Sequence, residues 1–178
     1  MTTTTFRAIR PVEGEFLPYY GQYIDKVPDG DIVETLKSQV SETLALIRSI
    51  PAGDSDKRYA PDKWSIREVV GHVIDAERIF VYRALRFARA DSTPVPGFDE
   101  NTYAKNGPYS HVSLADIASE LEHVRAATVH FFGNLEEQAL SRRGSANGAE
   151  ISVRGLAYVL AGHEIHHVGV LRTRYLNA

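Results

Sequence analysis

Cysteine is absent from this sequence of 178 residues. The chain therefore has no disulfide, no thiolate metal ligand and no cysteine nucleophile, and only His, Asp or Glu side chains could hold a metal ion. An excess of positive charge is also lacking, because the formal net charge is −3 and the isoelectric point is about 6.2. Neither a nucleic acid nor an anionic membrane is predicted as a partner.

Long apolar runs are missing as well. No stretch approaches the roughly 20 apolar residues that span a bilayer, and the first residues, MTTTTFR, lack the apolar core of a secretory signal peptide. We therefore expect a cytoplasmic protein. The hydrophobic content of 43% is close to the globular average, and the chain is long enough to bury one substantial core. A single domain over residues 1–178 is expected.

Apolar residues recur at helical spacing in four long segments. Pro51 ends the first of them, and the pair Ser65 and Glu68 forms a capping box that opens the second. Ser113 and Ser152 are well placed to cap the third and the fourth. The expected helices cover residues 32–50, 65–90, 114–135 and 153–175.

The connections between these helices differ in length. Residues 91–112 form a long link, in which Pro94, Pro96 and Gly97 forbid regular helix, and such a link can be a lid or a crossover between helices. The segment before the fourth helix, through Gly148, is expected to form turns. Residues 1–28 are expected to be an irregular segment that packs on the bundle. The predicted fold is all-α: a four-helix bundle with a long crossover loop and an irregular N-terminal segment.

The last predicted helix carries a cluster of histidines in the sequence HEIHH, at residues 163–167. On a helical wheel the apolar stripe points within about 30° of His163 and about 10° of His167, whereas His166 lies roughly 90° away. Imidazoles at positions i and i+4 that face a core require hydrogen bonds, water or a metal ion. His163 and His167 are therefore candidate ligands of one metal ion.

A third ligand is expected from another helix. Of the four remaining histidines, only His72 lies well inside the second predicted helix, with apolar neighbours at Val69, Val73 and Ala76. Three histidines leave at least one coordination position open, as in catalytic zinc sites. Glu68 and Asp75, three or four residues from His72, could orient its imidazole by a hydrogen bond.

The pattern His163-Glu164-x-x-His167 is also that of zinc metalloproteases, in which the glutamate is the general base. Glu164 is therefore the candidate catalytic residue, although it lies about 70° from the centre of the apolar stripe and could face a cavity or a neighbouring helix. Residues 168–178 contain no His, Asp or Glu, so a downstream third ligand is missing. A metalloprotease is a remote alternative.

Two further groups of residues have competing interpretations. Arg78, Arg83, Arg86 and Arg89 form a ridge on the second helix that could attract an anionic co-substrate, but the favoured interpretation is a solvated face. Tyrosines within residues 19–23 could line the mouth of a pocket or cover the end of the bundle.

The segment WSIREVVGHVIDAE at residues 64–77, followed about ninety residues later by HEIHH, resembles the DinB/YfiT family of metal-dependent four-helix bundles. The resemblance extends through YRALRFAR and PGFD, at residues 82–89 and 96–99, and covers most of the chain from about residue 30 onward. It implies that His72, His163 and His167 bind one divalent ion, zinc or nickel.

The resemblance also implies a range of activities. Relatives include hydrolases and thiol S-transferases that use bacillithiol or mycothiol, so the expected function is a metal-dependent enzyme on a small-molecule substrate, in which the metal activates water or a low-molecular-weight thiol. Because the chain has no cysteine, any thiol must come from a second molecule. The alternative is a non-catalytic metal-binding or stress-associated interaction protein, since fold does not determine function. A homodimer is an open alternative to a monomer.

Overall fold

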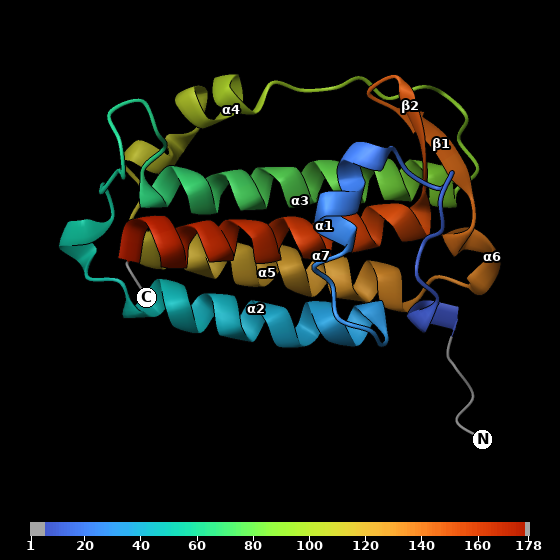
Figure 1. Cartoon of the computed structure of the whole chain (residues 1–178), viewed down its shortest axis with the longest axis horizontal. Helices are drawn as coiled ribbons and strands as arrows, with labels where there is room; N and C mark the ends of the chain where they lie inside the picture. The colour runs from blue at the N-terminus through green and yellow to red at the C-terminus, as the bar shows by residue number, and fades with distance from the viewer. Residues whose placement is uncertain (1–5, 177–178) are drawn as a thin grey trace.

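Four long helices form a bundle in the computed structural model, which describes residues 6–176 (Figure 1). Helix α3 packs against α7 and α5, and α2 packs against the same two helices. This is the predicted all-α four-helix bundle. The four helices are α2 (Ile32–Ser49), α3 (Ile66–Ala88), α5 (Leu114–Gly133) and α7 (Val153–Val170).

Ser65, Ser113 and Ser152 are the predicted caps of α3, α5 and α7, and Asp31 caps α2. Asp31, Ser65, Ser113 and Ser152 each accept a hydrogen bond from a backbone N–H in the first turn, which satisfies a donor that the helix itself leaves unpaired. Ser65 and Glu68 form the predicted capping box. The last helix departs from the prediction at its end, because the α-helix stops at Val170 and a π-helical turn (Leu171–Leu176) continues it.

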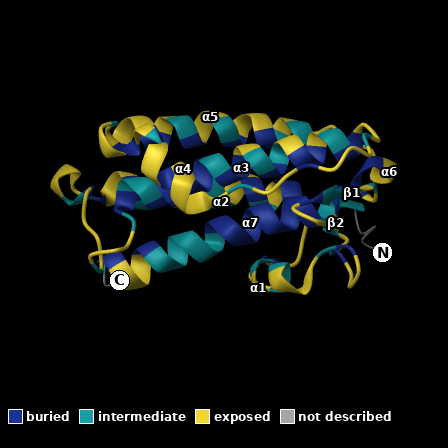
Figure 2. Cartoon of the chain, turned by 90° about the horizontal axis from the view of Figure 1, so that it is seen from above, coloured by how far each residue is buried: buried dark blue, intermediate teal, exposed yellow. Residues whose placement is uncertain are grey.

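The bundle has two apolar clusters, one toward each end. The first surrounds Leu36, Phe87 and Phe132, and the second surrounds Ile47, Ile74 and Leu121. Most of α7 up to Glu164 is buried, as Figure 2 shows, because α1 packs on it in addition to α3 and α2. The polar side chains of its middle turns lie between the two clusters.

The predicted crossover connects α3 to α5. It returns the chain along the length of the bundle, so that α5 runs in the same direction as α3 (Figure 1). The short helix α4 (Glu100–Asn106) within it was not predicted, although Asp99 caps that helix by accepting from the N–H of Thr102. A 3-10 turn (Pro108–Ser110) follows and buries Tyr109.

A β-hairpin replaces the turns that were expected before α7. Strands β1 (Arg143–Ala146) and β2 (Ala149–Ser152) are antiparallel and follow the short helix α6 (Glu137–Leu140). Asn147 and Gly148 join them, with φ of 54° and 78°, the conformation that a two-residue hairpin loop requires. The N–H of Val95 donates to Ser145 O, so the hairpin holds the crossover.

The segment before α2 contains two 3-10 turns (Phe6–Ala8 and Pro18–Tyr20) and the single helical turn α1 (Gly21–Ile24), which packs against α7. Residues 1–5 and 177–178, which the predicted domain includes, lie outside the described residues. Among the described helices, none combines the length and the apolar character needed to cross a membrane.

The capping box generates a pH-dependent prediction. Burial alone would raise the pKa of Glu68, but the hydrogen bond from the N–H of Ser65 and the ion pair with Arg58 outweigh burial and lower it. A carboxylate with a lowered pKa stabilises the fold above its unfolded pKa, and this contribution is lost as the pH falls through the folded pKa. Glu68→Gln should therefore lower the free energy of unfolding at pH 7 by about 0.5–1 kcal/mol.

Urea unfolding at pH 7 and at about pH 3 checks this, since the difference between the variant and the parent should shrink toward zero in acid. Glu122→Gln, which removes an ion pair between two largely exposed side chains, is the matched control and should have little effect. An effect of Glu68→Gln that is equally large in acid would contradict the electrostatic account.

Candidate metal centre

Three histidines from two helices converge in the seam between α3 and α7. Nε2 of His163 lies 3.0 Å from Nε2 of His72 and 3.1 Å from Nε2 of His167. One ligand atom from each of the three lies within 4.8 Å of the others. The structure therefore brings together all three residues predicted as metal ligands.

The two short contacts of His163 cannot both be hydrogen bonds. In a neutral imidazole, Nε2 carries either one proton or one lone pair, so it makes a single hydrogen bond at a time. One of the two contacts is therefore left without a proton between the nitrogens. A cation among three lone pairs removes this conflict, and nitrogens that bind zinc at about 2.0–2.1 Å in a tetrahedral arrangement lie about 3.3 Å apart. The donor set and its spacing fit a divalent ion.

Burial keeps the three imidazoles in the form that binds a cation. It lowers the pKa of His72 to about 4 and that of His167 to about 3, and the pKa of His163 lies well below its usual value for the same reason. At neutral pH the cluster is therefore uncharged. Its nitrogens are free to coordinate a metal ion without first losing protons.

A glycine precedes each of the two buried histidines, and each glycine admits a close neighbour. A Cβ at Gly162 would lie 2.0 Å from the backbone oxygen of Tyr23, and a Cβ at Gly71 would lie 2.3 Å from the ring of Tyr109. The first contact places the ring of Tyr23 5.5 Å from that of His163. Both glycines thus let other segments pack directly beside the cluster.

The cluster borders a cavity of about 390 Å³, within the usual range for small-molecule sites. The ring of Trp64 lies close to that of His72, with 4.7 Å between ring centroids and a tilt of 45°. A second cavity, of about 280 Å³, also borders Trp64 and His167. The first cavity is lined by Tyr19, Tyr20, Tyr23, Trp64, His72, Ala76, Phe80, Arg83, Phe98, Glu100, Asn147, His163, His166 and His167.

The structure decides between the competing interpretations of the tyrosines and arginines. Residues 19–23 line the cavity rather than cover an end of the bundle. The solvated-face interpretation is wrong for Arg83, which is buried and lines the same cavity, whereas Arg78 and Arg89 are exposed. The wheel could not show this, because the crossover and the N-terminal segment cover the turn of α3 that contains Arg83.

Glu164 faces neighbouring helices and not the histidine cavity. Its Oε2 accepts a hydrogen bond of 2.6 Å from Arg125 Nη2 on α5 and another of 2.6 Å from Gln39 Nε2 on α2. Arg125 also forms a two-pronged ion pair with Glu77 on α3. The four residues Gln39, Glu77, Arg125 and Glu164, one from each helix of the bundle, are called the polar layer below. A catalytic role for Glu164 stays a prediction, and its contacts favour a supporting one.

Neither Asp75 nor Glu68, the two predicted hydrogen-bond partners of His72, bonds to it. Asp75 accepts from the hydroxyl of Tyr109, and Glu68 is engaged in the capping box. The expectation that either orients His72 is therefore wrong, because both carboxylates are held by other partners. His166 flanks the cluster, as the wheel predicts, with its ring 5.5 Å from that of Tyr23.

Sequence reasoning missed Glu100 and Asn147, which also line the cavity. Glu100 opens α4 and lies close enough to His72 to favour its protonated form, although burial outweighs this effect on the pKa. Asn147 lies in the hairpin loop. The pair Asn147-Gly148 is a strong hairpin signal that was available in the sequence, but nothing local indicates that the hairpin reaches the cavity.

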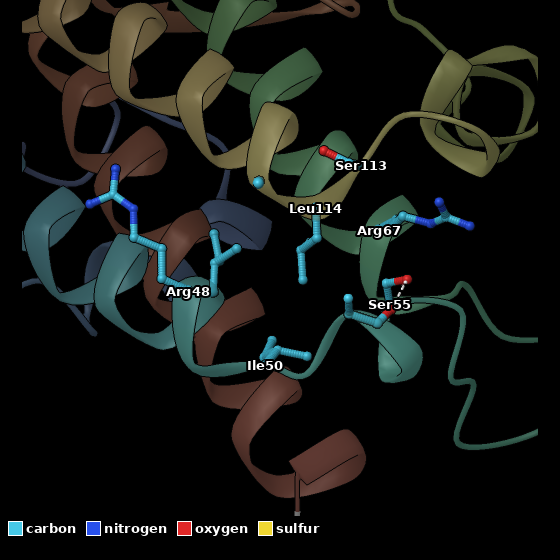
Figure 3. Close-up of a pocket in the computed structure, with 9 residues that line it drawn as sticks. Arg48, Ile50, Ser55, Arg67, Ser113 and Leu114 are labelled. Carbon is cyan, nitrogen blue, oxygen red and sulfur yellow. Dashed lines mark hydrogen bonds between the residues drawn. The ribbon is translucent and has the colours of Figure 1, made fainter.

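A separate cavity of about 370 Å³ lies among the ends of α2, α3 and α5 (Figure 3). Leu114 and Ile50 point into it, and Arg48 and Arg67 at its edge form ion pairs with Glu122 and Asp56. It contains none of the predicted site residues.

The fold and the histidine cluster together define a helical-bundle protein with a candidate metal centre. The chain belongs to the DinB superfamily, whose family model matches residues 35–171. This span includes all three histidines and the four bundle helices apart from the first turn of α2.

One protein of known sequence and two solved structures are similar to this chain. A protein of Oceanobacillus iheyensis named "Putative metal-dependent hydrolase" is 29% identical over 148 residues, which are 82% of each chain. YfiT from Bacillus subtilis, described as a probable metal-dependent hydrolase with an unusual four-helix bundle topology, superposes with a TM-score of 0.67 at 16% identity and 93% coverage of both chains. A mycothiol-dependent maleylpyruvate isomerase has a TM-score of 0.65 at 15% identity, over 82% of this chain and 61% of the isomerase. The two structures show the shared fold.

The close contact at Gly162 gives a prediction for the N-terminal segment. Gly162→Ala should push the backbone of Tyr23 away from α7 and lower the free energy of unfolding by about 1–3 kcal/mol. Gly169→Ala on the same helix is the control, because a Cβ there meets nothing within 4 Å and alanine favours helix by up to about 1 kcal/mol. Urea unfolding of both variants checks this, and equal stability of the two would show that Tyr23 does not pack at Gly162.

Proposed function

We propose that this chain binds one divalent metal ion through His72, His163 and His167 and is a metal-dependent enzyme acting on a small molecule. The observation that carries the proposal is the convergence of three neutral imidazole nitrogens at the wall of a cavity. Within the described residues, no fourth His, Asp or Glu joins the group. A three-histidine set with an open side is the arrangement expected of a catalytic metal site.

The bound ion would lower the pKa of a water or thiol, so that an anionic nucleophile is available near neutral pH. The residues of the chain provide the surroundings for this reaction. Glu100 is placed to accept the proton that the nucleophile loses, because its carboxylate is on the cavity wall near His72. Trp64, Phe80 and Tyr23 give the wall an apolar surface that limits access of bulk water.

The nucleophile can be water or a low-molecular-weight thiol. The names of the relatives support both, since they include metal-dependent hydrolases and a mycothiol-dependent isomerase. Any thiol must be a second small molecule, because the chain has no cysteine. The two cavities that meet at His167 and Trp64 offer separate space for a thiol and its partner. We place the protein in the cytoplasm, where such thiols stay reduced.

The cavity and the contacts of Glu164 disfavour the two alternatives, a non-catalytic metal-binding protein and a metalloprotease. A non-catalytic metal protein has no need for an open side to its metal, and the three histidines border about 390 Å³ of cavity. A metalloprotease needs its glutamate beside the metal, and the carboxylate of Glu164 is instead held by Arg125 and Gln39. The geometry therefore favours an enzyme in which Glu164 has a structural role.

Replacement of the ligands gives the direct test of metal binding. Isothermal titration of metal-free protein with zinc and with nickel should show about one ion per chain, and His72→Ala, His163→Ala and His167→Ala should each weaken binding by roughly 100-fold or more. His166→Ala is the matched control, because it neighbours His167 but does not belong to the cluster. The protein should carry no histidine tag, which could itself bind nickel.

Stoichiometric binding that survives all three ligand substitutions would refute the site. A loss of binding in His166→Ala as large as in His167→Ala would also contradict it, because the flanking ring would then be a ligand. Elemental analysis of the purified protein identifies which ion the chain acquires, since three histidines suit zinc and nickel alike.

Glu164→Gln separates a structural from a catalytic role for this carboxylate. The substitution keeps the shape but removes the charge that faces Arg125, so we expect the free energy of unfolding to fall by about 1–3 kcal/mol. Zinc stoichiometry should stay at about one per chain. Unchanged stability in urea unfolding, together with abolished peptide cleavage in a zinc-loaded sample, would instead support the metalloprotease alternative.

A further inference from the structure

Arg83 differs from the other arginines of α3 in its surroundings. Its residue surface is only 3% exposed, and it lines the cavity that the histidine cluster borders. Arg78 pairs with Glu120, and Arg86 pairs with Asp91. Within residues 6–176 no carboxylate lies within ion-pair distance of Arg83, so its positive charge has no counterion there.

The hydrogen bonds of Arg83 do not exhaust its donors. Nη2 donates to the backbone oxygen of Pro96 over 3.0 Å, and the hydroxyl of Tyr20 is close enough to interact with the guanidinium. Nε is buried and finds no partner. A buried cation without a counterion is costly, and structural anchoring of the crossover through Pro96 would need only a neutral donor.

The position of Arg83 relative to the metal centre follows from helix geometry. Arg83 lies three turns beyond His72 on α3, about 16 Å along the axis and about 20° around it. Ala76 and Phe80 lie between the two on the same face and line the cavity floor. Phe98 on the crossover adds a second apolar wall. The cavity thus has imidazoles at one end, an apolar middle and a cation at the other end.

We propose that Arg83 binds the carboxylate of an elongated small molecule whose opposite end reaches the three histidines. This inference rests on the proposed function, because it assigns the substrate class of the same site. A planar carboxylate matches the fork of a guanidinium and supplies the missing counterion. In the metal-free cavity, Glu100, near His72, repels an anionic group from the histidine end, so Arg83 marks the end at which a carboxylate binds.

A matched pair of thiols tests the proposal by calorimetry on the zinc-loaded protein. The probes 6-mercaptohexanoate and 6-mercaptohexanol share a thiol and an alkyl chain and differ in the carboxylate. The unsubstituted protein should bind the acid at least roughly tenfold more tightly than the alcohol, the gain expected from one charge-assisted pair. Arg83→Met should remove this preference, whereas Arg86→Met should keep it.

A second variant covers the possibility that Arg83→Met does not fold. Arg83→Lys retains the charge without the fork, so it should keep part of the preference for the acid. A purely structural role for Arg83 would lower the melting temperature of both variants and leave the acid-to-alcohol ratio unchanged. Equal affinity of the two thiols in the unsubstituted protein, or a preference that survives Arg83→Met, would overturn the proposal.

The metal-free protein distinguishes this inference from the proposed function. The charge of Arg83 does not depend on the metal, so the acid should remain preferred there although both thiols bind more weakly. If zinc does not tighten the binding of either thiol, the proposed use of the metal fails. If zinc tightens both equally and the acid has no advantage, only the role of Arg83 fails.

Discussion

The guanidinium of Arg125 links the four long helices near the middle of the bundle. From α5 it bonds to both carboxylate oxygens of Glu77 on α3, to Oε2 of Glu164 on α7 and to the backbone oxygen of Leu36 on α2. The side chains of Arg125, Glu77 and Glu164 are buried, so a sliding of α3, α5 or α7 by one turn would leave a charge unpaired in the core. We regard this polar layer as the constraint that sets the register of the helices.

The metal centre depends on that register. His72 lies five residues before Glu77 on α3, and His163 directly precedes Glu164 on α7, so the helices that meet at Arg125 carry the histidines into contact. Three neutral imidazoles at this spacing cannot satisfy one another by hydrogen bonds, which is an unfavourable arrangement unless a cation is bound. The polar layer thus holds in place a site that would otherwise relax. Glu164 belongs to this layer, so its carboxylate faces Arg125 and Gln39 and not the histidines, although its position in the sequence matches the protease pattern.

The sequence predicted the parts of this structure that depend on local patterns. The three serine caps, the capping box at Ser65 and the ends of α2 and α3 follow from short-range chemistry and apolar spacing. The wheel found His163 and His167 because burial of one helical face is periodic, and it placed His166 correctly on the flank. The choice of His72 needed one further step, namely that a histidine among apolar neighbours faces a seam between helices.

The remaining features depend on contacts between distant segments. Arg83 looks like its exposed neighbours in the sequence, and it is buried because the crossover and residues 19–23 cover that turn of α3. The partner of Glu164 is Arg125, 39 residues away on α5, and no helical wheel of a single helix could identify it. The hairpin was signalled by Asn147-Gly148, but its contact with Val95 brings together residues that no local pattern connects.

The central claim is that one metal ion lies among Nε2 of His72, His163 and His167. An anomalous difference map from crystals of the zinc-loaded protein, measured on both sides of the zinc absorption edge, locates the ion directly. We expect a single strong peak per chain, about 2.0–2.1 Å from each of the three nitrogens, for an ion whose free coordination position faces the cavity lined by Arg83. A peak held by other residues, or closed by a fourth protein ligand, would contradict it.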